Sequence, residues 1–230
     1  MGFQWALSLP THYFVQFSFS DRTRQEPSPL ETVIMHQLYA VVLAAGSSER
    51  LGQPKPMVLV RIGKREIPLI KWLVERLECA GITPIVVTNQ ELLVPVTFAL
   101  PERTVVLNPA PEKGRTGSIQ CGLATIIANI KGKRGMNVLI TPVDRPGFSA
   151  STLEALRHTE DTACPAKDGR GGHPVLITAE DVERIMLSEP ETPLRDLISP
   201  MRINVADRFL HLNIDTPDDL DELQQAVEEL

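Results

Sequence analysis

The sequence predicts a single doubly wound α/β domain, a sandwich built on one mostly parallel sheet. Two observations indicate this fold class. From Leu38 onward, short apolar runs alternate with helical patterns. The runs are apolar on both faces, as in parallel strands that helices cover on each side. In such sheets ligands bind at the carboxyl ends of the strands, so the candidate chemistry is sought there.

Five strands are expected, each an apolar run of four to six residues: 38–43, 84–88, 104–107, 137–142 and 173–177. Helices are expected between and after them: 67–80, 117–130, 149–157, 179–187 and 216–229. Start signals support three of these helices, namely Pro68, Ser149 and Thr216 followed by Pro217. The order of elements is therefore βαβα throughout.

Composition limits the class of protein. A chain of 230 residues fits one domain, or one domain with an appendage, and 43% hydrophobic residues are too many for a disordered chain. The formal net charge of −6 provides no broad basic surface for nucleic acid. No apolar run approaches the roughly 18 to 20 residues that span a bilayer. Any bound phosphate must therefore occupy a local site.

The three cysteines, Cys79, Cys121 and Cys164, are far apart and form no CxxC pair. This spacing argues against a zinc knuckle and against a disulfide-stapled secreted domain. None has a sequence neighbour that would lower its pKa, so a cysteine nucleophile is not expected. We therefore expect a reducing, cytoplasmic environment.

Residues 1–34 differ in composition from the rest of the chain. They hold six of its eleven aromatic residues, and residues 20–29 are polar with two prolines, like a linker. The first basic residue is Arg22, which does not match a signal peptide. We expect 1–34 to be an extension outside the fold and 35–230 to form the domain.

The first expected strand runs into the segment LAAGSSERLGQPK, residues 43–55. A turn of small residues exposes backbone N–H groups, and Arg50 and Lys55 add two full charges, which together suit a polyphosphate. The segment is neither a Walker A loop nor a GxGxxG turn. The alternative is an ordinary turn with two solvated cations.

The segment NPAPEKGRTGS, residues 108–118, follows the third expected strand and opens a helix. The Asn108 amide can donate and accept hydrogen bonds, and Ser118 near a helix N-terminus can meet an anion. Taken alone, the segment is equally explained by turn chemistry and helix capping.

A carboxylate, Asp144, follows the expected strand 137–142. This is where a metal-binding Asp belongs in an open α/β sheet, because Mg²⁺ takes one or two protein carboxylates and completes its shell with phosphate oxygens and water. Asp144 could instead cap the turn before Pro146. Asn213 and Asp215 are expected one alternation apart in a strand, so that one could complete a metal site with Asp144.

His173 ends the glycine-rich segment DGRGGH. The glycines would allow a loop to move over a substrate, although a packed or hydrogen-bonded histidine is favoured over a general base.

Five segments in this order resemble the MobA-like nucleotidyltransferase family, and within it they are most similar to molybdenum cofactor cytidylyltransferases. The family pattern LAAGxSxRMGxxK matches residues 43–55 with Leu51 in the Met position. The Asn-Pro and GxxxS pattern matches 108–118, DxP matches 144–146, GHPVL matches 172–176 and DIDTPEDL matches 213–220. Two departures are Asn213 in place of the first Asp, and Pro56 after Lys55.

The resemblance implies a Rossmann-like nucleotidyltransferase fold and a role for each matching residue. The nucleotide-binding set would be Leu43, Ala44, Gly46, Ser47, Ser48, Asn108, Ser118 and His173. Arg50 and Lys55 would hold the triphosphate, and Asp144 would hold Mg²⁺. Asp215 is the expected second metal ligand, with Asn213 as the alternative.

The implied reaction is transfer of CMP from CTP to the terminal phosphate of molybdopterin, with release of pyrophosphate. Arg50, Lys55 and Asp144 would be the catalytic residues. A molybdenum enzyme that receives the cofactor is the implied partner. The alternatives are a GTP-dependent or other nucleotidyltransferase acting on a sugar phosphate or similar metabolite, and a nucleotide-binding module without turnover.

Overall fold

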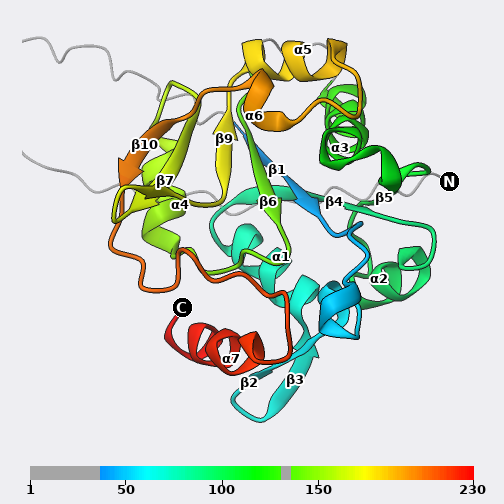
Figure 1. The fold of residues 1–230 in the computed structure, drawn as a ribbon, viewed down its shortest axis with the longest axis vertical. Coiled ribbons are helices and arrows are strands. Elements are labelled where there is room, and N and C mark those ends of the chain that lie inside the picture. The colour runs from blue at the N-terminus through cyan, green and yellow to red at the C-terminus, as the bar shows by residue number, and fades with distance from the viewer. Residues whose placement is uncertain (1–36, 131–135) are drawn as a thin grey trace, which may run out of the picture. The chain divides into compact units, whose positions relative to one another are not determined.

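The computed structural model describes residues 37–130 and 136–230, and its centre is an eight-stranded sheet (Figure 1). Seven strands follow the order β10-β7-β9-β6-β1-β4-β5, and β8 pairs with β7. Their bounds are β1 Leu38–Leu43, β4 Ile82–Thr88, β5 Val105–Leu107, β6 Val138–Pro142, β7 Ala163–Lys167, β8 Arg170–Gly171, β9 Val175–Ile177 and β10 Met201–Asn204. The predicted boundary after residue 34 lies outside the described residues.

The middle of the sheet is parallel, as predicted. β1 lies between β4 and β6, and Val41 is opposite both Ile85 and Ile140. Alternate residues of β1 enter different cores: Ala40 and Val42 pack on one face, and Val41 and Leu43 pack on the other. A strand that is buried on both faces has no polar side, which is why the sequence of β1 is uniformly apolar.

Helices cover both faces and confirm the doubly wound α/β class. Their bounds are α1 Leu69–Cys79, α2 Leu93–Ala99, α3 Arg115–Ile130, α4 Ala150–Arg157, α5 Ala179–Leu187, α6 Leu194–Leu197 and α7 Asp219–Glu229. Leucines of α1, α4 and α7 pack in one hydrophobic core, while Ile119 and Leu123 of α3 and Ile185 of α5 pack in the other. Within the described ranges, no helix is long and apolar enough to cross a bilayer.

The expected βαβα order throughout is wrong in two places. β2 Leu59–Ile62 and β3 Arg65–Pro68 form a separate antiparallel hairpin, which turns at Gly63 with a φ of 59°. β9 is antiparallel to both β6 and β7. A parallel crossover needs a dozen or more residues, whereas only residues 168–174 separate β7 from β9, so the chain turns back through β8.

The packing of α3 on β1 depends on Gly122. A Cβ atom at this position would lie 2.5 Å from Cγ1 of Val41, closer than carbon atoms can approach. Glycine therefore lets α3 lie close against the strand that leads into the loop after β1.

Candidate active site

A cavity of about 470 Å³ opens where β1 and β6 end. Ten of the predicted site residues line it: Leu43, Ala44, Gly46, Ser47, Ser48, Arg50, Lys55, Ser118, Asp144 and Asp215. The remaining lining comes from Ala45, Glu49, Pro56, Pro111, Gly114, Arg115, Pro142 and Val143. The cavity thus lies at the carboxyl edge of the sheet, where an open α/β fold places its ligand.

The loop after β1 is tied to the neighbouring strand and to itself. The Ala44 N–H donates to the Val87 carbonyl at 2.8 Å, and the Asn89 side chain donates to the Ala45 carbonyl at 3.2 Å. Ser48 has a φ of 55°, and its hydroxyl accepts the Lys55 N–H at 3.1 Å. This bond closes the loop into a ring, which brings the side chain of Lys55 back toward β6.

Four charged side chains form one ion-paired cluster in this cavity. Nζ of Lys55 lies 3.0 Å from Oδ2 of Asp144 and 2.6 Å from Oδ1 of Asp215. Arg50 forms a salt bridge of 3.0 Å with the other oxygen of Asp215. The Lys55 side chain is 13% exposed and that of Arg50 is 73% exposed, so the lysine lies at the bottom and the arginine at the rim.

The hydrogen bond from Lys55 lowers the pKa of Asp215 below its ordinary value of 3.8. A hydrogen bond from Asn213 and the positive charges of Lys55 and Arg50 act in the same direction. Asp215 is therefore ionised at neutral pH and presents its negative charge to the cavity.

The expectation that Asn213 and Asp215 lie in a strand is wrong, because residues 212–216 form an irregular segment. The segment crosses the end of β6, where the Ile214 N–H donates to the Asp144 carbonyl at 3.0 Å. The Asp219 carboxylate accepts the backbone N–H groups of Asp215 and Thr216, and α7 begins at Asp219 rather than at Thr216. Asp215 faces the cavity, and Asn213 supports it with a hydrogen bond.

Asn108 lies behind the cavity rather than on its wall. Its side chain is 3% exposed, donates to the Ser118 hydroxyl at 2.9 Å and accepts the Ala110 N–H at 2.9 Å. These bonds fix the loop after β5 against the start of α3. Ser118 is the member of this pair that lines the cavity.

His173 also lies outside the cavity lining. The register Val138↔Ile177 to Ile140↔Val175 brings the start of β9 to the carboxyl end of β6, so His173 is a neighbour of the segment that carries Asp144. Burial, followed by the charges of Arg115 and Arg145, lowers the pKa of His173 to about 4. The imidazole is therefore neutral at physiological pH.

Sequence reasoning missed Arg115 and Arg76. Arg115 lines the cavity from the start of α3, in a motif from which only Asn108 and Ser118 were singled out. Arg76 of α1 is half-buried, donates to the Pro146 carbonyl at 3.1 Å in the turn that follows Asp144 and lies over the Trp72 ring. Burial lowers the pKa of Arg76 to about 10. Neither residue has a local sequence signal that marks it.

The two carboxylates fit a hard divalent cation. Asp144 and Asp215 already share one cationic group, the ammonium of Lys55, so both reach a common point. Within 37–130 and 136–230 no cluster of three or more His, Cys, Asp or Glu side chains is arranged to hold a metal. Two carboxylates are what Mg²⁺ uses when phosphate oxygens and water complete its shell.

Comparison with known structures gives the same fold at low sequence identity. Rv0371c from Mycobacterium tuberculosis H37Rv superposes with a TM-score of 0.65 and 23% identity, covering 83% of this chain and 98% of that chain. Molybdopterin-guanine dinucleotide biosynthesis protein A from Archaeoglobus fulgidus gives 0.60 and 20%, covering 84% and 100%. The 4-diphosphocytidyl-2C-methyl-D-erythritol synthase from Anaerococcus prevotii DSM 20548 gives 0.57 and 16%, covering 84% and 96%.

No curated protein matches the sequence. The family model for the MobA-like NTP transferase domain does match, over residues 40–212. This range contains the loop after β1, the segment 108–118 and the turn that carries Asp144. The match extends over most of the chain, and the mostly parallel sheet matches the fold of the structural neighbours. The chain belongs to the MobA-like NTP transferase family and is a nucleotidyltransferase of that family.

Proposed function

We propose that the protein transfers CMP from CTP to the terminal phosphate of molybdopterin in the cytoplasm, with Mg²⁺, and releases pyrophosphate. The observation that carries this proposal is the cluster of Lys55, Asp144 and Asp215 in the cavity. It combines two carboxylates that can share one cation with a lysine that can neutralise phosphate. A molybdenum enzyme would receive the product.

The loop after β1 would hold the triphosphate. Gly46, Ser47 and Ser48 line the cavity beside Arg50 and Lys55, so backbone groups and two cations face the same space. Lys55 would exchange its carboxylate partners for phosphate oxygens once nucleotide and metal are bound. Bound Mg²⁺, held by Asp144 and Asp215, would shield the charge of the phosphate groups.

The reaction needs positioning and charge neutralisation more than proton transfer. An oxygen of the acceptor phosphate attacks the α-phosphorus of CTP and forms a new P–O bond. The bond from the α-phosphorus to the bridging oxygen breaks, and pyrophosphate leaves with the electron pair. Arg50 and Lys55 would stabilise the charge that grows on pyrophosphate. The acceptor is already an anion, so no general base is required, which agrees with a neutral His173 outside the cavity lining.

Two comparison structures support parts of the proposal. Rv0371c has also been solved in complex with manganese, which supports a divalent cation. The Archaeoglobus protein is named for molybdopterin, which supports the acceptor, but also for guanine. That second name favours one alternative, transfer of GMP from GTP to the same acceptor.

The test is pyrophosphate release by the full chain with molybdopterin, comparing CTP, GTP, ATP and UTP, each with and without Mg²⁺. We expect release that needs CTP, Mg²⁺ and molybdopterin together. Release with GTP alone would replace CTP by GTP in the proposal. Release only with a sugar phosphate in place of molybdopterin would overturn the acceptor.

A second measurement distinguishes nucleotide binding without turnover from catalysis. Thermal stabilisation by each nucleotide reports binding to the folded state whether or not a product forms. Stabilisation by CTP and Mg²⁺ without pyrophosphate release from any acceptor would indicate a nucleotide-binding module instead of an enzyme.

A further inference from the structure

Three arginines come from segments near the turn that carries Asp144. Arg115 lies at the start of α3, Arg145 follows Asp144 directly and Arg170 lies in β8. The Arg145 guanidinium interacts electrostatically with Arg115 and Arg170, and also with Asp144 and Asp215. We call these three residues the arginine cluster.

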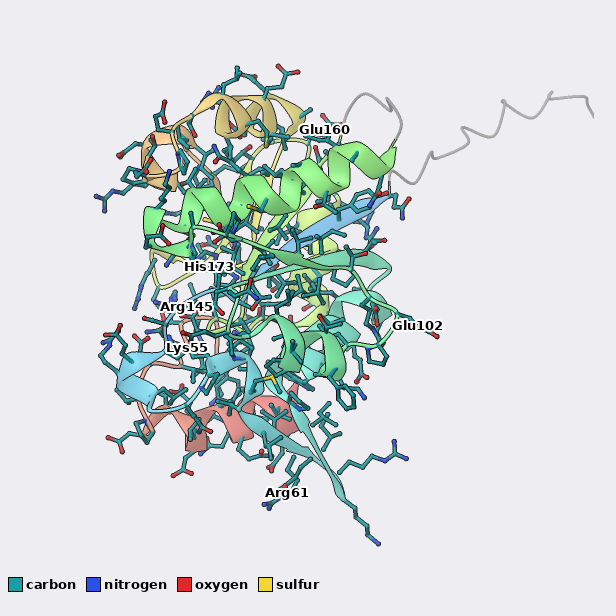
Figure 2. The ribbon with its side chains drawn as sticks, turned by 90° about the vertical axis from the view of Figure 1, so that its right-hand side faces the viewer. Lys55, Arg61, Glu102, Arg145, Glu160 and His173 are labelled. Atoms are coloured by element: carbon teal, nitrogen blue, oxygen red, sulfur yellow. The ribbon has the colours of Figure 1, made fainter. Side chains whose placement is uncertain are left out.

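The order of strands separates Arg170 from the expected triphosphate loop, whereas Arg115 lines the same cavity as that loop. β6 has β1 on one side and β9 on the other. The triphosphate loop leaves β1, whereas β8 and the start of β9 lie on the opposite side of Asp144. Figure 2 shows Lys55, Arg145 and His173 following one another in that order along one side of the molecule. The turn that carries Asp144 therefore lies between the triphosphate loop and β8.

The arginine cluster lacks the partners that other arginines have. Arg50, Arg103 and Arg184 each lie within 3.0 Å of a carboxylate oxygen. In the described part of the chain, no carboxylate lies within 4.0 Å of the Arg115, Arg145 or Arg170 side chains, and none of the three makes a side-chain hydrogen bond. Like charges that have no direct ion-pair partner repel each other, so an anion at this place would be stabilised.

Among the three arginines, Arg145 has the highest free-energy cost from lacking an ion-pair partner. Its side chain is half-buried, so its charge loses part of its contact with water. Partly buried charges in proteins are normally paired. His173 adds no compensating charge, since it is neutral beside Arg115 and Arg145.

We propose that the arginine cluster is the binding site for the phosphate monoester of the acceptor. This inference rests on the proposed function, because a second phosphorylated substrate must lie near Asp144 opposite the triphosphate. Guanidinium groups suit a phosphate dianion because they donate parallel hydrogen bonds to two of its oxygens. Three cations also reduce the repulsion between the acceptor phosphate and the nucleotide that it attacks.

The placement limits the class of acceptor. Arg115 reaches the cavity, Arg145 is half-buried and Arg170 is exposed at the end of the β7–β8 turn. The phosphate would lie between the buried and the exposed arginine, so the rest of the acceptor would extend toward solvent past β8. Acceptors with a terminal phosphate fit this arrangement, and uncharged acceptors do not.

The binding test uses inorganic phosphate as the probe and the thermal stability of the full chain as the readout, without nucleotide. We expect phosphate to stabilise the wild type and Arg50→Gln alike, and Arg145→Gln to weaken phosphate binding about tenfold or more. Arg61→Gln, on the β2–β3 hairpin away from the cavity, is the matched control for loss of one arginine. Exposed Arg170→Gln, expected to weaken binding severalfold, keeps the test valid if Arg145→Gln fails to fold.

Absence of stabilisation by phosphate in the wild type would overturn the proposal. So would binding that is lost in Arg50→Gln but unchanged in Arg145→Gln, because phosphate would then occupy the triphosphate loop. A different result would contradict the proposed function alone: phosphate stabilises the wild type, but no nucleotide does. In the active enzyme, Arg145→Gln should raise the KM for the acceptor about tenfold and leave the KM for nucleotide unchanged.

Discussion

The two sides of Asp144 differ in how their charges are satisfied. On the β1 side, Lys55 and Arg50 make three contacts of 2.6 to 3.0 Å with Asp144 and Asp215. The arginine cluster, which extends from α3 to β8, has no such contact among the described residues. One side holds its functional groups in place before any ligand arrives, whereas the other keeps positive charge available for one.

The difference has a simple physical origin. A paired charge is already oriented, so Lys55 faces the cavity before a triphosphate arrives and then only exchanges its carboxylate partners for phosphate oxygens. An unpaired cation attracts an anion at a distance but is not held in one geometry. Substitutions that disturb geometry should therefore impair the paired side, and substitutions that remove a positive charge should impair the unpaired side.

The largest effect is expected for Asp144→Ala. It removes a carboxylate that Lys55 contacts at 3.0 Å and that would hold Mg²⁺, and we expect kcat for pyrophosphate release to fall about 10³-fold. The unfolding midpoint should change little, since the Asp144 side chain is 27% exposed. Asp161→Ala, an exposed carboxylate before β7, is the control and should retain full activity. Activity of Asp144→Ala within tenfold of the wild type would remove Asp144 from the mechanism.

Lys55→Met comes next, because it leaves two carboxylates facing each other without their shared cation. We expect kcat/KM for CTP to fall about 10²-fold, as for loss of a charged group that acts on the transition state. Lys71→Met removes a lysine with a surface ion pair of 3.9 Å to Glu75 and is the matched control. A Lys55→Met enzyme no worse than Lys71→Met would show that Lys55 only stabilises the loop.

The stability of Lys55→Met relative to the wild type should also depend on pH. Lys55 lowers the pKa of Asp215 below 3.8, so the stabilisation is present above that value and is lost as pH falls through the lower, folded value. Lys55→Met lacks this contribution at every pH. The difference in Tm between wild type and variant should therefore be largest near neutral pH and should shrink in acid. A difference that is constant with pH would attribute the effect to packing.

Strands and helices whose sequence follows one regular hydrophobic pattern from end to end could be predicted. β1 and α5 have the predicted bounds because one is uniformly apolar and the other has a regular apolar stripe. β7 was missed because ACPAK contains small residues and a proline, and α2 because LVPVTFA contains Pro95. Their structure depends on tertiary packing that overrides local propensity.

Within the site, the parts that lie in one segment were predictable and the contacts between segments were not. The loop after β1 and Asp144 follow from local motifs. Lys55 contacts carboxylates 89 and 160 positions away, and only the fold shows that they share one lysine. The arginine cluster likewise comes from α3, the Asp144 turn and β8, and none of these segments has a basic pattern of its own.

Gly147→Ala should displace the backbone of the turn after Arg145, on the unpaired side. A Cβ at Gly147 would lie 1.8 Å from the Phe209 carbonyl oxygen, and a backbone atom cannot give way as a side chain can. We expect a loss of about 2 kcal/mol in unfolding free energy, seen as a fall in Tm of several degrees. Gly46→Ala is the control for stability, because its Cβ would meet nothing within 4 Å. Equal Tm values for the two variants would show that the turn after Arg145 adjusts freely.

The smallest effect is expected for Ser48→Ala, on the paired side. The variant loses the 3.1 Å hydrogen bond from the Lys55 N–H to the Ser48 hydroxyl, which contributes about 1 kcal/mol to closing the loop. The KM for CTP should rise a few fold while kcat stays nearly constant, because the cations are still present but less well oriented. Ser48→Gly loses the same bond but suits the φ of 55° without strain, so it separates the two contributions. If Ser48→Gly restored the wild-type KM, backbone conformation rather than the hydrogen bond would hold the paired side ready for its ligand.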